Sequence, residues 1–246
     1  MGNPFVAAFI SQILRITLKF YCQKKIMIID LHIHTTISGD SIITPEILIM
    51  TAKNAGLDGL CITEHGVKKS KIAKALSERY NFPVFGGMEA STAIGDILIF
   101  GIDSYPRNIY KIQDIKQYVE ENGGVIIAAH PFRRQFYKSY SGKKLTFKAA
   151  CQSQFLQLVN TMEVFNGCST EQESLMCEKV CKKLGLHGTG GSDAHIPKQI
   201  GSCVTVFENI ITNEQELTDE LKSGRYKAKD LRCQKYKCPI NWFSDD

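Results

Sequence analysis

The 246-residue chain is predicted to fold as an α/β domain of the barrel type, on three observations. It is long enough for one large single-core domain, or for two small ones. From Met27 onward, short apolar runs alternate with helical stretches, which is typical of parallel strands joined by crossover helices. Polar residues close most of these runs, and β/α barrels build their active sites at the carboxyl ends of their strands.

The first apolar run, MIIDLHIH, covers residues 27–34. Thr44 then starts a helix as its N-cap, with Pro45 in the first helical position and Glu46 in the first turn, and Gly56 ends it. Further helices are expected over residues 68–79, 112–122, 171–184 and 213–223. Further strands are expected in GLCITEH, PVFGGMEAS, DILIFGID, VIIAAH, TMEVFNG, HGTGGSDAH and VTVFE.

The composition is that of an ordinary globular protein with a net charge of +5. This charge suits an anionic substrate but is far below that of a dedicated DNA-coating protein. The nine cysteines are scattered and include no CxxC pair, which gives a zinc ribbon little support. We expect them to be buried, reduced thiols of a cytoplasmic protein.

Residues 1–26 form an extension ahead of the predicted domain. Its apolar part, residues 5–20, is interrupted by Arg15 and Lys19 and is short for a membrane span. It also lacks the early positive region and the cleavage site of a secretory signal. Two alternatives stay open, a peripheral amphipathic helix and a poorly ordered extension. We expect no stable membrane span, a domain over residues 27–230 and a tail over 231–246.

His32 and His34 give the sharpest sign of function. Residues two apart on a strand point to the same face, so both imidazoles could hold one metal ion. Asp30 could accept a hydrogen bond from a ring on that face. Five of the six histidines fall at strand ends, and only His187 is expected to be structural. The other candidate ligands at strand ends are His65, Glu89, His130, Asp193 and His195.

Mixed imidazole and carboxylate ligands suit zinc, manganese or iron. A carboxylate such as Glu89 can bridge two ions. Paired divalent ions are a standard device for holding the attacking and leaving oxygens in phosphoryl transfer. The pattern therefore predicts a metal-dependent phosphoesterase.

The sequence resembles the PHP family, the polymerase-and-histidinol-phosphatase domain, over about residues 27–208. The resemblance lies in DLHIHT with Asp40 just after it, and in TEHG, GGMEAST, AAHPFR, EVFNG and GGSDAH. It implies a distorted barrel of seven strands, with a site for two or three divalent ions (Mn, Zn or Fe) at one mouth. It also implies that EVFNG supplies Glu163 and Asn166 to line or support the site.

The resemblance further implies how the ligands are shared. One ion would be held by His32, His34, Glu89 and Asp193. Glu89 would bridge to a second ion held by His130. Asp40, His65 and His195 would hold a third.

Two positions depart from the family pattern. Many members carry Asp where this chain has Glu64, and several carry a His shortly after the bridging glutamate, where this chain has Asp96. Asp96 could supply an oxygen ligand to the second ion, or it could be an ordinary residue of the loop or strand start.

A basic stretch begins at Arg133, close behind His130. Residues 133–148 contain no acidic residue, and their aromatic and basic side chains are interleaved. Guanidinium groups bind phosphate in a fork, and aromatic faces can stack on bases. The alternative is a solvated basic loop. The residues concerned are Phe132, Arg133, Arg134, Phe136, Tyr137, Lys138, Tyr140, Lys143, Lys144, Phe147 and Lys148.

These observations predict hydrolysis of phosphoester bonds by a metal-activated water, in nucleotides or at oligonucleotide ends. Arg133 would stabilise the phosphoryl oxygens, and Asp193 or His195 would handle protons. The runner-up is a small-molecule phosphatase of the histidinol-phosphate type. A different class also stays open, namely a catalytically silent module that binds metal or plays a structural part. The oligomeric state is not predicted.

Overall fold

The computed structural model describes residues 26–66, 68–104, 111–133 and 145–232. Within these ranges, nine strands form one sheet in the order β7-β6-β5-β4-β3-β2-β1-β8-β9. The strands are β1 Met27–Asp30, β2 Gly59–His65, β3 Val84–Thr92, β4 Gly95–Phe100, β5 Val125–Ala128, β6 Thr161–Asn166, β7 His187–Gly191, β8 Cys203–Phe207 and β9 Tyr226–Asp230.

The expected helices are confirmed, with boundaries shifted by at most two residues. They are α2 Pro45–Asn54, α3 Ser70–Tyr80, α4 Ile112–Glu121, α8 Glu171–Leu184 and α9 Glu214–Ser223. The side chain of Thr44 caps α2 by accepting from the backbone N–H of Ile47, and Gly56 follows the helix with a φ of +74°. Two short helices were not predicted, α6 Phe147–Cys151 and α7 Gln154–Gln157, because so few residues show no helical period. A 3₁₀ turn, η1, covers Pro197–Gln199.

The sheet is mixed, which corrects the expectation of parallel strands. Strands β1, β2 and β3 pair in parallel, as do β5, β6 and β7. Strand β4 is antiparallel to both of its neighbours, because a two-residue turn joins it to β3 and so short a connection permits only an antiparallel pair. Strand β8 is antiparallel to β1 and β9.

The strand number of seven was also wrong. Eight of the nine strands lie in the eight apolar runs expected from the sequence. The ninth, the edge strand β9, has the sequence YKAKD, in which only Tyr226 is buried and both lysines are exposed. Polar edge strands of this kind give a weak apolar signal. The wider prediction of an α/β barrel is confirmed.

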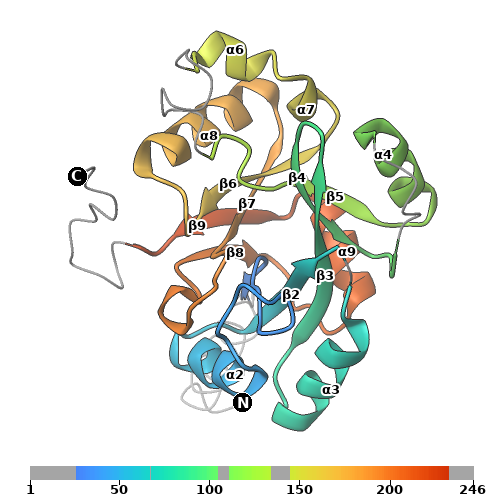
Figure 1. Cartoon of the computed structure of the whole chain (residues 1–246), viewed down its shortest axis with the longest axis vertical. Coiled ribbons are helices and arrows are strands. Elements are labelled where there is room, and N and C mark those ends of the chain that lie inside the picture. Colours follow the sequence, from blue (N-terminus) through green and yellow to red (C-terminus); the bar gives the residue numbers. More distant parts are fainter. Residues whose placement is uncertain (1–25, 67, 105–110, 134–144, 233–246) are drawn as a thin grey trace, which may run out of the picture.

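A parallel bridge between Ile33 and Ala194 nearly closes the sheet into a barrel. The backbone N–H of Asp193 donates to the carbonyl of His32 at 2.7 Å, and that of His34 donates to the carbonyl of Ala194 at 3.1 Å. Strands occupy the centre of Figure 1, with α2 and α3 on one side, α4 and α9 on another, and α6, α7 and α8 on a third. The segments after β1 and after β7, which carry candidate ligands, therefore lie side by side.

The interior of the barrel is apolar towards the end that α9 covers. Leu217 and Leu221 of α9 pack with Met27, Phe85 and Phe207 in one buried cluster. At Gly191, where the chain approaches β1, an added Cβ would lie only 2.5 Å from the Cβ of His32. A glycine is therefore required there for the barrel to close.

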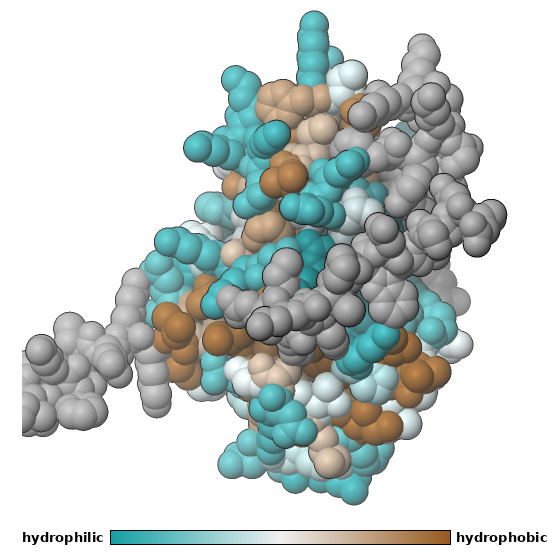
Figure 2. Space-filling view, turned by 90° about the vertical axis from the view of Figure 1, so that its left-hand side faces the viewer, coloured by the Kyte–Doolittle hydropathy of each residue, from teal (hydrophilic) through white to brown (hydrophobic). Residues whose placement is uncertain are grey.

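Apolar side chains on the face drawn in Figure 2 occur in small groups separated by hydrophilic ones. Scattered exposed apolar residues are normal and require no partner. Among the residues that the structure describes, no helix has both the length and the apolar character needed to span a membrane. Six cysteines in this part are free, and four of them, Cys61, Cys177, Cys181 and Cys203, are buried as expected.

Several predictions concern residues outside the described ranges. These are the two alternatives for residues 1–25, most of the basic stretch with Arg134, Phe136, Tyr137, Lys138, Tyr140, Lys143 and Lys144, and the C-terminal tail from residue 233. The domain limits of 27 and 230 likewise stay predictions.

Candidate metal centre

All eight predicted ligands meet at the mouth of the barrel. Their donor atoms form overlapping groups in which every atom lies within 4.8 Å of the others. The groups are His34, Asp40, His65 and His195; His32, His130 and Asp193; His32, His34 and Glu89; and Glu89, Asp96 and His130. Most of these residues reach one end because the carboxyl ends of the parallel strands share that edge of the barrel. Asp96 reaches it from the amino end of β4, which runs in the opposite direction.

The buried part of the centre contains His32, His34, Glu89 and Asp193. The Nε2 atoms of the two histidines lie 3.1 Å apart, and Oδ1 of Asp193 is 3.4 Å from His32 Nε2 and 3.3 Å from His34 Nε2. Glu89 places one oxygen 3.6 Å from His32 Nε2 and the other 3.3 Å from His34 Nε2. Four donors held about 2.0–2.1 Å from one ion in a tetrahedron lie about 3.3–3.4 Å apart. The donor spacing therefore fits a first-row divalent ion.

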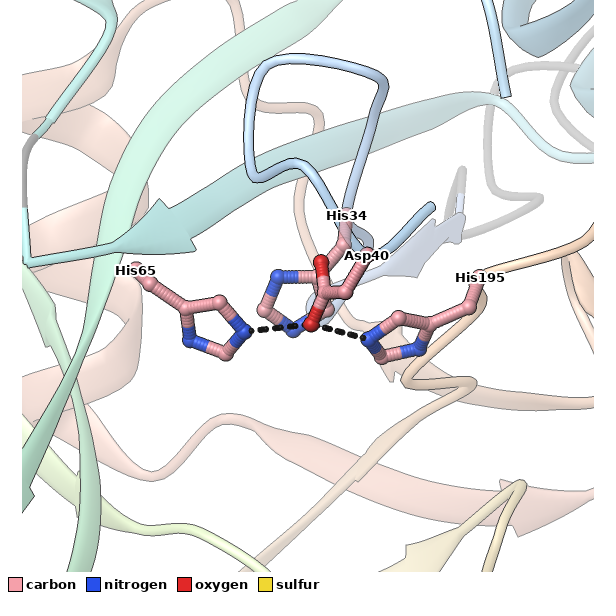
Figure 3. Close-up of side chains that lie close together, drawn as sticks. All are labelled: His34, Asp40, His65 and His195. Atoms are coloured by element: carbon pink, nitrogen blue, oxygen red, sulfur yellow. Dashed lines mark hydrogen bonds and ion pairs between the residues drawn. The ribbon is translucent and has the colours of Figure 1, made fainter. Parts of the chain in front are cut away.

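The second group lies nearer to solvent. Oδ2 of Asp40 is 3.0 Å from Nε2 of His65 and 3.3 Å from Nε2 of His195. Figure 3 draws these two contacts as dashed lines, with the ring of His34 beside them. Nδ1 of His65 is 3.1 Å from an oxygen of Glu89. The side chains of Asp40 and His65 are each 47% exposed, whereas that of Glu89 is 6% exposed. The centre thus runs from a buried floor to an open rim that a substrate can reach.

His130 lies on the other side of Glu89. Its Nε2 is 3.0 Å from Oε1 of Glu89, and a carboxylate oxygen of Asp96 belongs to the same group. The backbone of His130 has a φ of +27°, and that of Asp193 a φ of +52°. Non-glycine residues seldom adopt such angles, and they cluster at functional sites where the surrounding structure holds them.

The charges of the centre are strongly coupled. Burial disfavours protonation of His32, but the carboxylates of Asp193, Glu163 and Glu89 outweigh it and raise the pKa of His32 well above its usual value. The pKa of His34 is also raised, by Asp193 and Glu89 against burial. Against their own burial, the histidines lower the pKa values of Glu89 and Asp193. The carboxylates therefore stay ionised, as metal ligands must be.

Glu163 orients two of the histidines. Its Oε1 lies 3.0 Å from Nδ1 of His32, and its Oε2 accepts from the backbone N–H of His130 at 2.9 Å and from the side chain of Asn166 at 3.0 Å. A carboxylate on Nδ1 leaves Nε2 of His32 free for a metal. The supporting role expected for Glu163 and Asn166 agrees with these contacts.

Asp30 does not contact the ring of His32, so that prediction was wrong. Its carboxylate accepts from the backbone N–H groups of His32, Ser192 and Gly201 at 3.3, 2.8 and 2.8 Å. Burial raises the pKa of Asp30 to about 6, although these bonds oppose the rise. Asp30 thus holds the backbone just before Asp193. The hydrogen bond to the ring of His32, which was expected from Asp30, comes from Glu163 instead.

Glu64 also lies away from the donor groups. Along β2, Cys61 faces the barrel interior, while Leu60 and Ile62 pack in the cluster that contains α2 and α3 side chains. Alternation puts Glu64 on the side of Leu60 and Ile62. Its carboxylate accepts from the hydroxyl groups of Thr35 and Ser38. Glu64 therefore orders the loop between His34 and Asp40.

Arg133 joins the centre through its guanidinium group. Nη2 donates to Oδ2 of Asp193 and, at 2.7 Å, to Oδ1 of Asn166. Against burial, Asp193 raises the pKa of Arg133, so the group is always charged. Its Nε is buried and has no hydrogen-bond partner among the described residues.

Sequence reasoning missed Arg232, which it placed in a tail. Its guanidinium contacts the carboxylate of Asp230, the carbonyl of Ser169 and, at 3.0 Å, the hydroxyl of Ser174. It thereby holds the loop that follows Asn166. No pattern in the sequence signals this long-range contact. His187 begins β7 at the other end of the barrel beside Tyr226, away from the donors.

The fold and the site together define an α/β barrel protein with a centre for divalent metal ions at its mouth. The family model described as the PHP domain matches residues 30–180, and one described as PHP-associated matches residues 175–226. The chain therefore belongs to the PHP family.

The similar proteins include an uncharacterised protein of Methanocaldococcus jannaschii, 30% identical over 42% of this chain and 67% of its own length. A protein of Caldicellulosiruptor saccharolyticus named "Probable phosphatase" is 24% identical over 78% of this chain and 90% of its own.

Solved structures share the fold. One is a two-domain protein of Bacteroides vulgatus that contains a predicted PHP-like metal-dependent phosphoesterase. It has a TM-score of 0.61 and 19% identity, over 84% of this chain and 65% of that one. Another is a lesion-specific endonuclease of Pyrococcus furiosus, with a TM-score of 0.56 and 15% identity, over 83% of this chain and 58% of that one.

Proposed function

We propose that this protein is a metal-dependent hydrolase of phosphoester bonds, acting on nucleotides or at oligonucleotide ends. The observation that carries the proposal is the convergence of His32, His34, Glu89 and Asp193 at spacings that suit one divalent ion. The family and the relative named "Probable phosphatase" support hydrolysis of phosphoesters as the reaction class.

The donor groups support two or three ions. One would be held by His32, His34, Glu89 and Asp193, and another by Asp40, His65 and His195 with His34 nearby. Glu89 lies within 3.6 Å of a histidine in each group, so the ions would share it. Bound divalent ions lower the pKa of water and stabilise negative charge on phosphoryl oxygens. Manganese, zinc and iron all suit these donors.

Arg133 would bind the phosphoryl group. Its buried Nε has no hydrogen-bond partner among the described residues, and an unpaired buried donor is costly. A phosphate oxygen would supply the missing acceptor, and guanidinium groups bind phosphate in a two-pronged fork. Asp193, to which Arg133 donates, keeps the guanidinium beside the metal donors.

Asp193 or His195 would handle protons. The side chain of His195 is 29% exposed at the rim, and its Nδ1 lies 2.9 Å from the carbonyl of Asp193. If only two ions bind and neither is at the rim, Nε2 of His195 stays free of metal and could transfer a proton, while the contact of Nδ1 keeps the ring in place. No covalent intermediate on the protein is required.

The choice of nucleotides rests on the basic stretch from Arg133 to Lys148, with its interleaved aromatic residues. The endonuclease of Pyrococcus furiosus, which shares the fold, acts on nucleic acid, and this agrees with the choice. A phosphatase of the histidinol-phosphate type is the second candidate, because such an ester needs the metals and Arg133 but no base stack. The third candidate is a catalytically silent module that binds metal or plays a structural part. Cytoplasmic location stays a prediction.

A phosphate-release screen on metal-loaded protein tests the proposal. The panel should contain nucleoside monophosphates, nucleoside bisphosphates, 5′-phosphorylated oligonucleotides and histidinol phosphate, with metal-stripped protein as the blank. We expect turnover of nucleotides or oligonucleotides that is lost on stripping. Faster turnover of histidinol phosphate would favour the second candidate. Bound metal with no release from any ester would favour the silent module.

A further inference from the structure

We propose that Asp96, together with Glu89 and His130, forms an oxygen-rich cation site that discriminates less strongly against Mn²⁺ in favour of Zn²⁺ than the nitrogen-rich sites beside it. The inference rests on the metal-binding part of the proposed function and is independent of the substrate. In an excess of Mn²⁺ over Zn²⁺, the centre would therefore hold both metals.

The direction of β4 places Asp96 at the mouth. Because β4 is antiparallel to β3, its first residues, and not its last, lie at the end of the barrel where the candidate ligands meet. Leu98 and Phe100 of β4 belong to the cluster inside the barrel, whereas Ile97 and Ile99 pack on the outer side. Side chains alternate along a strand, so Asp96 lies on the inner side above Leu98.

Asp96 is also fixed next to His130. The backbone N–H of Ala129, the residue before His130, donates to the carbonyl of Asp96 at 2.9 Å. A carboxylate oxygen of Asp96, an oxygen of Glu89 and a ring nitrogen of His130 lie within 4.8 Å of one another. This is close enough for a single ion to bind all three.

The carboxylate of Asp96 has no hydrogen bond or ion pair in the part of the chain that the structure describes, although the residue is half-buried. Within that part, neither Asp96 nor Glu89 is paired with a lysine or arginine. Two carboxylates placed so close together repel each other. A divalent cation between them would remove the repulsion and give Asp96 a partner.

The donor types separate this site from its neighbours. Glu89, Asp96 and His130 offer two oxygens and one nitrogen, whereas the group at the rim offers three imidazoles and one carboxylate. Carboxylate oxygens suit Mn²⁺ and Mg²⁺, and imidazoles suit zinc and iron. Mn²⁺ is therefore expected to compete with Zn²⁺ more successfully at Asp96 than elsewhere in the centre.

The test compares wild-type protein with Asp96→Asn and Asp96→His. Each full chain is stripped of metal and dialysed to equilibrium against mixtures in which Mn²⁺ exceeds Zn²⁺ by stepwise larger factors. Bound metal is measured by mass spectrometry, and Mn²⁺ affinity is measured by EPR of the free ion. Asp114→Asn, which changes an exposed aspartate of α4, is the matched control.

As the Mn²⁺ excess rises, we expect wild-type protein and Asp114→Asn to exchange Zn²⁺ for about one Mn²⁺ per chain while the other sites keep Zn²⁺. Asp96→Asn should weaken this Mn²⁺ by about tenfold or more, since even loss of an outer-sphere partner costs 10–100-fold. Asp96→His should replace the Mn²⁺ by Zn²⁺ at an unchanged total. Unchanged Mn²⁺ affinity in Asp96→Asn, or an unchanged metal ratio in Asp96→His, would overturn the proposal. Because no substrate is involved, neither result bears on the proposed hydrolysis, which the phosphate-release screen tests separately.

Discussion

Nδ1 of His32 lies 3.0 Å from Oε1 of Glu163, and both side chains are buried. Oε2 of Glu163 accepts from two further N–H groups, those of His130 and Asn166. A glutamine has only one acceptor oxygen, so it cannot serve both sides. In one orientation its NH₂ group would face the N–H groups of His130 and Asn166, and donor would meet donor. In the other orientation its NH₂ group would donate to Nδ1 of His32, so the ring proton would sit on Nε2, the nitrogen that would bind metal.

We therefore predict that Glu163→Gln weakens metal binding by about 10–100-fold while the fold is retained. Isothermal titration of the stripped protein with Zn²⁺ measures this change. Glu178→Gln, an exposed change on α8, is the control and should bind metal like the wild type. Equal affinity in both variants would show that Glu163 does not orient His32.

Glu89→Gln should abolish turnover and leave the fold largely intact. The substitution keeps the shape of a side chain that contacts His34, His65 and His130 but removes the charge that the ions would share. Phosphate release and circular dichroism measure the two effects. Glu89 is not the bridge if more than about one part in a hundred of the activity survives, because loss of a main electrostatic contributor costs about 10²–10³ in rate.

Arg133→Ala should raise KM for every phosphate ester, because it removes a charge-assisted contact worth about 1.5–3 kcal/mol. Tyr137→Ala and Tyr140→Ala should act differently. If they stack bases, they should weaken nucleotide substrates by about 1–3 kcal/mol per stack and leave histidinol phosphate nearly unchanged. Steady-state kinetics on both substrate classes measures this difference.

The salt dependence of substrate affinity gives a second test of whether the basic stretch from Arg133 to Lys148 binds nucleic acid. An oligonucleotide that contacts several of Lys138, Lys143, Lys144 and Lys148 should lose affinity with rising salt more steeply than a mononucleotide does. If the tyrosine variants weaken both substrate types equally and the salt slopes are equal, the stretch is a solvated surface loop that does not bind bases.

Metal binding should release protons near neutral pH. In the metal-free protein the pKa values of His32 and His34 are raised by the neighbouring carboxylates, against the effect of burial. Both rings are therefore protonated below these raised values and must lose the protons when an ion binds. Apparent metal affinity should fall as the pH falls. Titration calorimetry in buffers of different ionisation enthalpy measures the release, and heats that do not depend on the buffer at pH 7 would contradict it.

Much of the centre could be predicted because its ligands follow simple rules of strand geometry. His32 and His34 stand two residues apart just after β1, and His65 and Glu89 are register partners on the parallel strands β2 and β3, so their convergence follows from sequence spacing and strand pairing. The resemblance gave Glu163 a supporting role, but its contact with His32 and the role of Arg232 were not predicted, because both contacts are long-range. Glu163 is 131 residues from His32, and Arg232 is 63 residues from Ser169.

The reversal of β4 was also missed, although the turn that causes it is local. Two apolar runs separated by Ala93 and Ile94 permit a hairpin, but the regular alternation with helices elsewhere favoured a parallel strand. The reversal brings Asp96 to the mouth, which is the position that the proposed cation site requires. Asp30 was misassigned because spacing alone does not show that the chain leaves the regular strand after it.

The number of metal ions bound per chain tests the central claim most directly. Eight predicted ligands meet at one mouth, more than one ion can use. Protein purified without oxygen, then reloaded and freed of loosely bound metal, should contain two or more equivalents of Mn, Fe or Zn by elemental analysis. A value at or below one equivalent after the same treatment would contradict the multi-metal centre.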